Sequence, residues 1–159
     1  MSPVRAIPDG MTAITPHLVC RGAAEAIDFY KKAFGAVEYA RQAMPDGKLA
    51  HGLINIGGSC LMLVDEFPEQ GMLSPQALGG TPISIHLYVA DVDAAFAQAI
   101  AAGVKVIMPL ADMFWGDRYG VVADPFGHHW SLATHIRDLS QAEITAAMTG
   151  ACPDGSAQT

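Results

Sequence analysis

Two stretches of the chain repeat apolar residues at the spacing of one helix face. In residues 26–34 the apolar positions recur every three or four residues, and Gly35 is placed to end the helix. Residues 92–100 show the same spacing, with Asp91 at the start and Gly103 at the end. The pattern therefore predicts two amphipathic helices of similar length.

Strand-like runs surround both helices in the same order. One run precedes each helix and three follow it, separated by turn signals such as Pro45-Asp46-Gly47. The predicted strands are residues 13–20, 37–43, 49–56 and 60–65 in the first half, and 83–89, 104–108, 119–123 and 129–134 in the second. Both halves therefore have the order β-α-β-β-β.

The two halves are related by a constant offset. His17 and His86 lie 69 residues apart, and so do the turn glycines Gly58 and Gly127. Equal offsets near the start and the end of the unit indicate an internal repeat. A unit of this size cannot easily bury a sheet face alone, so we expect the two modules to pair about a pseudo-two-fold axis.

The predicted fold class is α+β. Two βαβββ modules, about residues 12–66 and 83–135, are expected to form a curved mixed sheet, a cup with the helices outside. The Gly- and Pro-rich segment 67–82 is predicted to be the linker between them. Residues 1–159 are expected to form a single domain of this kind.

The end of the chain lies outside the repeat. Ser140 and Glu143 have the spacing of a capping box, which predicts a short helix over residues 140–148. Residues 150–159 are expected to be a frayed tail.

Composition and charge argue against several classes of partner. Hydrophobic residues make up 51% of the chain and charged residues 16%, which is enough for a substantial core. Nine Lys and Arg against 16 Asp and Glu give a net charge of -7. We expect neither nucleic acid nor a membrane as partner, because phosphates and anionic lipids attract basic surfaces.

Hydropathy and cysteine usage indicate a cytoplasmic protein. No apolar run reaches the roughly 18 residues of a spanning helix, and the N-terminus has no apolar signal core. The three cysteines, Cys20, Cys60 and Cys152, are odd in number and lack CxxC spacing. This usage is typical of reduced thiols in the cytosol.

Several motifs in both modules carry a family resemblance. The segments are Thr15-Pro16-His17-Leu18, residues 24–30, Phe34-Gly35, residues 86–93, residues 115–120 and Asp124-Pro125-Phe126-Gly127-His128-His129-Trp130. They resemble the vicinal oxygen chelate superfamily of glyoxalases, bleomycin-resistance proteins and extradiol dioxygenases, above all its PhnB-like glyoxalase branch. The resemblance covers nearly all of the chain from Thr12 to His135, and it implies a small-molecule site in the cup and a homodimer.

The resemblance also implies where a metal would bind. Members that use a metal place one ligand near the start of each module's first strand and another on its fourth strand. Those positions fall on Thr15, Met62, Ser84 and Ser131, and none of these is a good ligand for a divalent ion. We therefore expect the standard metal site to be missing.

A displaced set of ligand-type residues lies beside those positions. Strand alternation places His17 and His86, and also Glu66 and His135, on the same faces as the standard positions. Each pair is separated by the repeat offset, so each pair is expected to converge near the axis. These four residues are candidate ligands for a divalent ion, although a pocket-lining role is the preferred interpretation for His17 and His86.

An aromatic segment between two strands is the remaining candidate. Trp115, Arg118 and Tyr119 suit either a flat or anionic ligand at the rim of the cup or a contact between subunits. The candidate ligand-binding residues are therefore His17, Met62, His86, Trp115, Arg118, Tyr119 and Ser131.

Two functions remain open. The favoured one is a binding protein that holds a hydrophobic or anionic small molecule without the standard metal site, as bleomycin-resistance members do. The alternative is a divalent-metal-dependent lyase, isomerase or dioxygenase-like enzyme for a substrate with vicinal oxygens. In such an enzyme the ion would stabilise developing enolate charge. Neither hypothesis assigns a catalytic residue.

Overall fold

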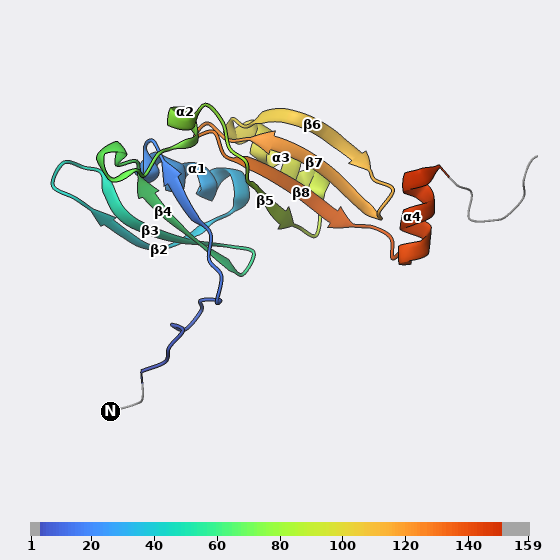
Figure 1. Ribbon diagram of the computed structural model, residues 1–159, viewed down its shortest axis with the longest axis horizontal. Coiled ribbons are helices and arrows are strands. Elements are labelled where there is room, and N and C mark those ends of the chain that lie inside the picture. Colours follow the sequence, from blue (N-terminus) through green and yellow to red (C-terminus); the bar gives the residue numbers. More distant parts are fainter. Residues whose placement is uncertain (1–3, 151–159) are drawn as a thin grey trace, which may run out of the picture.

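A computed structural model describes residues 4–150, which fold into two modules of the same element order (Figure 1). The predicted tail from residue 151 onward, with Cys152, lies outside the described residues. The first module contains β1 (His17–Cys20), α1 (Ala23–Phe34), β2 (Val37–Ala43), β3 (Leu49–Ile56) and β4 (Ser59–Asp65). The second contains β5 (Ser84–Tyr88), α3 (Val92–Ala102), β6 (Lys105–Asp112), β7 (Asp117–Ala123) and β8 (His129–His135).

Each module has its own four-stranded mixed sheet. The strand orders are β1-β4-β3-β2 and β5-β8-β7-β6, and only the first pair of each order is parallel. His17 lies opposite Met62, and His86 lies opposite Ser131. The registers thus match at the 69-residue offset, and the predicted α+β fold of two βαβββ modules is confirmed. The two sheets remain separate, with β1 at the edge of one and β5 at the edge of the other.

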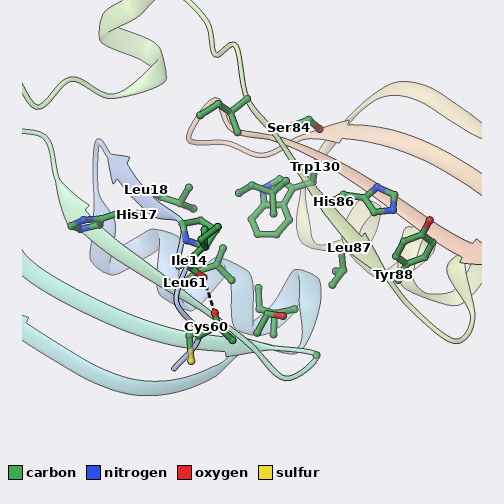
Figure 2. Close-up of a pocket in the computed structure, with 17 residues that line it drawn as sticks. Ile14, His17, Leu18, Cys60, Leu61, Ser84, His86, Leu87, Tyr88 and Trp130 are labelled. Carbon is green, nitrogen blue, oxygen red and sulfur yellow. Dashed lines mark hydrogen bonds between the residues drawn. The ribbon is translucent and has the colours of Figure 1, made fainter. Parts of the chain in front are cut away.

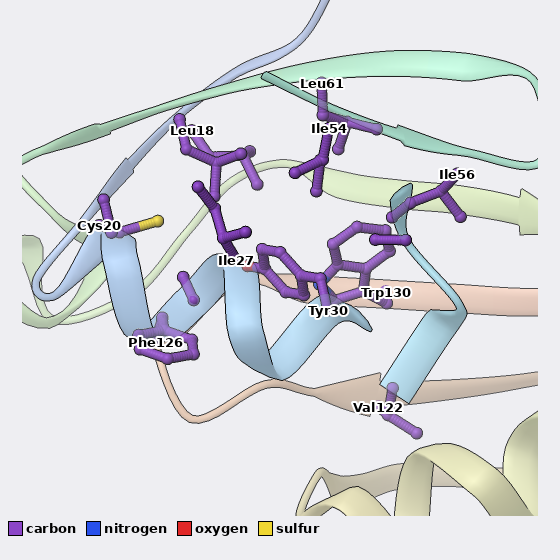
Figure 3. Close-up of a cluster of buried hydrophobic side chains, with 14 of the residues drawn as sticks. Leu18, Cys20, Ile27, Tyr30, Ile54, Ile56, Leu61, Val122, Phe126 and Trp130 are labelled. Atoms are coloured by element: carbon purple, nitrogen blue, oxygen red, sulfur yellow. The ribbon is translucent and has the colours of Figure 1, made fainter. Parts of the chain in front are cut away.

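The two modules share one hydrophobic core (Figure 3). Helices α1 and α3 pack against each other, and each covers one face of the sheet in its own module. Trp130 of β8 lies against Tyr30 and Phe34 of α1, with ring centroids 5.2 and 4.4 Å apart. A contact of this kind between aromatic rings from different modules fixes how the modules sit together.

A buried carboxylate reinforces this junction. Asp124, in the turn before β8, accepts hydrogen bonds from the Tyr30 hydroxyl at 2.6 Å and from the Trp130 indole at 2.9 Å. Its second oxygen accepts two backbone N–H groups of the same turn. The Asp-Pro-Phe-Gly turn therefore holds the second module on the helix of the first.

The segment between the modules is more structured than predicted. It contains a short 3-10 helix (Pro68–Gln70) and α2 (Pro75–Leu78). Ser74 starts α2 by accepting a hydrogen bond from the Ala77 amide, a local cap that hydrophobic periodicity does not reveal. The capping box at Ser140 is confirmed, and α4 (Gln141–Thr149) extends from the far end of β8 with no buried residue (Figure 1).

Some strand ends differ from the prediction. β1 begins at His17 rather than residue 13, although the carbonyl of Pro16 already accepts a hydrogen bond from the Met62 amide. β6 continues to Asp112 because Pro109 lies on an edge strand, where a missing N–H is tolerated. Among the described residues, no helix is long and apolar enough to cross a membrane.

Candidate functional site

The faces of the two sheets that the helices do not cover carry the predicted histidines. Leu18 and Leu63 lie on the helix side of the first sheet and are buried. Because side chains alternate along a strand, His17 lies on the opposite, uncovered face of this sheet. The matching register places His86 on the uncovered face of the second sheet.

His86 is held by a serine of the neighbouring strand. Its Nδ1 atom lies 2.7 Å from the Ser131 hydroxyl, which is almost fully buried. The pairing of β5 with β8 places these two residues directly opposite each other. The His86 ring also lies edge-on to Tyr88, at 4.4 Å, and nearly parallel to Tyr119, at 6.0 Å. The orientation of the imidazole is therefore fixed on three sides.

A second buried carboxylate organises the neighbouring rings. Asp117, at the start of β7, accepts hydrogen bonds from the Tyr88 hydroxyl at 2.8 Å and the Trp115 indole at 3.0 Å, both on Oδ2. Its Oδ1 atom lies 2.7 Å from Nδ1 of His135. Burial works to raise the pKa of Asp117, but these hydrogen bonds outweigh it and hold the pKa below its usual value. Asp117 is therefore an ionised anchor for three ring systems.

His135 lies between two carboxylates. Its second ring nitrogen is 3.0 Å from Asp138. Hydrogen bonds to Asp117 and Asp138 raise the pKa of His135, because an imidazolium can donate to both carboxylates while a neutral imidazole has one N–H. This residue supports the Asp117 cluster and the chain segment that leads to α4.

A groove of about 660 Å³ lies between β1 and β5 (Figure 2). His17 and His86 both border it, but the two rings lie at opposite ends and point away from each other. The repeat led us to expect that these two histidines converge within one chain. They do not converge, because β1 and β5 belong to separate sheets. The other principal lining side chains are largely apolar: Leu18, Leu61, Ile85, Leu87 and Trp130.

His17 has a different neighbour. The ring of His51 on β3 lies edge-on to it, with centroids 6.5 Å apart. Partial burial and the nearby His51 lower the pKa of His17, which favours the neutral imidazole. Met62, which lies opposite His17 in the sheet, shares this face.

The structure does not bring Glu66 and His135 together. Glu66, just after β4, pairs with Arg21 at 2.6 Å and accepts a hydrogen bond from the Ser74 hydroxyl at 2.5 Å. These bonds lower the pKa of Glu66 to about 2, whereas His135 is held by carboxylates of the other module.

The donor groups do not fit a divalent ion. Within residues 4–150, no group of three or more His, Cys, Asp and Glu side chains is arranged to hold a metal. Of the standard positions, Thr15 precedes β1 and Ser84 begins β5, while the hydroxyl of Ser131 is hydrogen-bonded to His86. The displaced set is spread over both modules, so the described part of the chain provides no three-ligand site.

Arg118 lies on the other side of the second sheet from Tyr119. Its guanidinium pairs with Asp93 of α3 at 2.8 Å and with Asp112 of β6 at 3.0 Å. Tyr119 lies 5.5 Å from Trp115 on the uncovered face. The structure therefore groups Trp115 and Tyr119 with His86, and it separates Arg118 from them.

Sequence reasoning did not single out Tyr88, Asp117 or His51. Tyr88 follows His86 by two residues, so strand alternation alone places it on the same face. The contacts of Asp117 and His51 depend on the pairing of strands far apart in the sequence, for which the sequence carried no local signal.

Comparison with known proteins agrees with this architecture. The family model of the Glyoxalase/Bleomycin resistance protein/Dioxygenase superfamily matches residues 11–132. The chain belongs to this superfamily. It is the superfamily that the sequence motifs resemble, so that prediction is confirmed.

The chain is also similar to individual relatives and solved structures. It is 54% identical to an uncharacterized protein of Mycobacterium tuberculosis over 86% of this chain and 82% of the relative. TioX from Micromonospora is 27% identical with a TM-score of 0.64, covering 79% of this chain and 99% of TioX. A PhnB protein from Bacillus cereus shares the fold, at 20% identity with a TM-score of 0.60, over 77% of this chain and 99% of that protein.

Proposed function

We propose that this protein binds a small molecule on the uncovered sheet faces, around His86 and Ser131, without the metal site of metal-dependent superfamily members. The fixed His86–Ser131 pair carries this proposal, because it presents an oriented polar group beside aromatic rings. Binding sites of this type combine apolar or aromatic walls with a few placed polar groups.

The arrangement of donors supports binding over metal chemistry. A divalent-metal-dependent lyase, isomerase or dioxygenase-like enzyme needs three or four protein ligands around one ion. Glu66 and His135, which would complete such a set, are each held by other side chains in different modules. These contacts favour a binding role without a metal.

We also propose that the protein is a homodimer and is cytoplasmic. Ile14 and Ile83 occupy equivalent positions in the repeat and are 85% and 69% exposed. They lie just before β1 and β5, whose outer edges border the apolar groove. A two-fold axis through this groove would place β1 of one copy beside β5 of the other, and it would bring His17 of the partner subunit to the face that carries His86.

The experiment is a thermal-shift screen of small molecules against protein purified without chelator or affinity tag. A ligand that binds only the folded state raises Tm. We expect hits whose shift is lost in His86→Ala and kept in Arg118→Gln, which alters the other face of the sheet.

Metal analysis of the same protein completes the test. Stoichiometric metal that disappears in a His17→Ala/His86→Ala double variant would overturn the binding proposal. So would a screen in which every hit is retained by His86→Ala.

A further inference from the structure

We infer that the ligand carries a planar aromatic group, neutral or cationic, which binds against a ring array formed by His86, Tyr88, Trp115 and Tyr119. This inference rests on the proposed function, because it names the chemical class of the ligand at the same site.

The ring array is continuous. Tyr88 lies edge-on to His86 and Trp115 lies edge-on to Tyr119, while the planes of His86 and Tyr119 differ by 18°. Between the rings of β5 and β7 runs β8, which contributes the small side chains of Ser131 and Ala133 to this face. Ser131 and Ala133 are buried beneath these rings, so the face presents a surface of aromatic rings, which suits a flat ring system.

These rings do not form part of the core. Tyr88 is 58% exposed although its hydroxyl is hydrogen-bonded to Asp117, His86 is also exposed, and Trp115 and Tyr119 are half-buried. Aromatic rings that serve only packing are normally buried, as Tyr30 and Trp130 are here. The ring array therefore offers apolar area to a partner molecule.

The array is also ordered before any ligand arrives. One buried carboxylate, Asp117, holds both Tyr88 and Trp115, and Ser131 holds His86. Fixing side chains in advance lowers the entropy that a ligand loses on binding. This order distinguishes the array from a set of mobile surface rings.

The charged groups around the ring array determine which flat ligands are favoured. Arg118, the cation expected to attract an anionic ligand, points to the opposite face and is neutralised by Asp93 and Asp112. Asp117 and Asp138 lie at the end of the array with only His135 between them, so two carboxylates face one imidazole there, and the chain has a net charge of -7. Ring faces attract cations, so neutral and cationic groups are favoured over carboxylates.

The test uses four probes in isothermal titration calorimetry at pH 7. They are 2-naphthol, 2-naphthylmethylammonium, 2-naphthoate and, as a cation without an aromatic ring, cyclohexylmethylammonium. We expect the first two to bind with Kd values at least about fivefold lower than that of naphthoate, and the cyclohexyl compound to bind weakly.

Variants locate the binding. Trp115→Leu and Tyr119→Leu are expected to weaken the naphthyl probes roughly tenfold, because each removes a ring contact. Trp115→Phe keeps an aromatic ring and is expected to retain most of the affinity for the naphthyl probes. This variant therefore distinguishes the loss of a ring contact from a folding defect. Tyr39→Leu is the control, since Tyr39 is a tyrosine of the first sheet whose exposure, 57%, matches the 58% of Tyr88 in the ring array.

Four results would overturn the inference. If the cyclohexyl cation binds as well as the naphthyl cation, or if Tyr39→Leu has the same effect as Tyr119→Leu, the ring array is not the site. If naphthoate binds best, the charge assignment is wrong. Hits from the thermal-shift screen that depend on His86 but lack aromatic rings would leave the proposed function standing and this inference refuted.

Discussion

At the scale of single residues, two buried carboxylates have different roles: one stabilises the core, and the other orders the candidate site. Asp124 joins Tyr30 to Trp130 inside the core, while Asp117 joins Tyr88 to Trp115 beside the uncovered face. Both carboxylates have several hydrogen-bond donors, which is the condition for keeping a charge out of water. The two clusters therefore use the same chemistry for different purposes.

His135 gives the Asp117 cluster a pH dependence. Its pKa is raised above the ordinary value of 6.5 by the hydrogen bonds to Asp117 and Asp138. A raised pKa in the folded state means that the stabilisation is complete below about pH 6.5 and is lost as pH rises through the folded-state value. We expect the free energy of unfolding of the wild type to fall relative to that of His135→Gln over this window, measured by urea denaturation at a series of pH values.

His129 provides the control for this measurement. It lies at the other end of β8 and has neither carboxylate contact of His135. A His129→Gln variant is expected to follow the wild-type pH profile. A His135→Gln profile that runs parallel to the wild type from pH 5 to 9 would contradict the assignment.

At the scale of elements, the loop between β6 and β7 is fixed by backbone contacts. The carbonyl of Gly116 accepts hydrogen bonds from the amides of Ile136 and Arg137, just after β8. A Cβ atom at Gly116 would lie 2.2 Å from the Arg137 carbonyl oxygen, and the φ angle there is +101°. The residue therefore has two separate reasons to be glycine.

This arrangement predicts the cost of a methyl group. Gly116→Ala is expected to reduce the free energy of unfolding by about 3 kcal/mol or more, because it adds a backbone clash to the strain of a positive φ. Gly47→Ala is the matched control: its φ is +89°, but nothing lies within 4 Å of the added Cβ. The control should cost only about 1 to 2 kcal/mol in chemical denaturation. Equal losses of unfolding free energy in the two variants would show that the clash with Arg137 does not contribute to the cost.

Local patterns predicted the elements better than the site. The spacing of apolar residues in α1 and α3 is a local property, as is the capping box at Ser140, and both were confirmed. Whether Arg118 faces the same side as Tyr119 follows from alternation once the strand is extended to Asp117. The distance between His17 and His86 could not be predicted, because it depends on how two separate sheets are placed by the shared core.

At the scale of the whole molecule, each sheet has two edge strands, and β1 and β5 are the two whose edges border the groove. Exposed strand edges tend to pair with another chain unless something covers them. Here both edges border one apolar groove, and each is preceded by an exposed isoleucine, Ile14 or Ile83.

Dimerisation through these edges can be measured directly. We expect light scattering to give a dimer for the wild type and a shift toward monomer for an Ile14→Asp/Ile83→Asp variant, because charges oppose edge pairing. Val37→Asp, on the outer strand β2, replaces a comparably exposed apolar residue, 57%, and is the control. A wild type that is monomeric at micromolar concentration would remove the dimer from the proposal.

The shared core has a consequence for the history of the repeat. Tyr30 of the first module donates a hydrogen bond to Asp124 and packs against Trp130, both in the second module. Neither module therefore has a complete hydrophobic core of its own. A gene fragment encoding one βαβββ unit of the present sequence would yield a chain with an unprotected aromatic surface and a tyrosine hydroxyl without its acceptor. The duplicated halves have thus become mutually dependent, and recombination that replaces one of them must preserve the side chains at their junction.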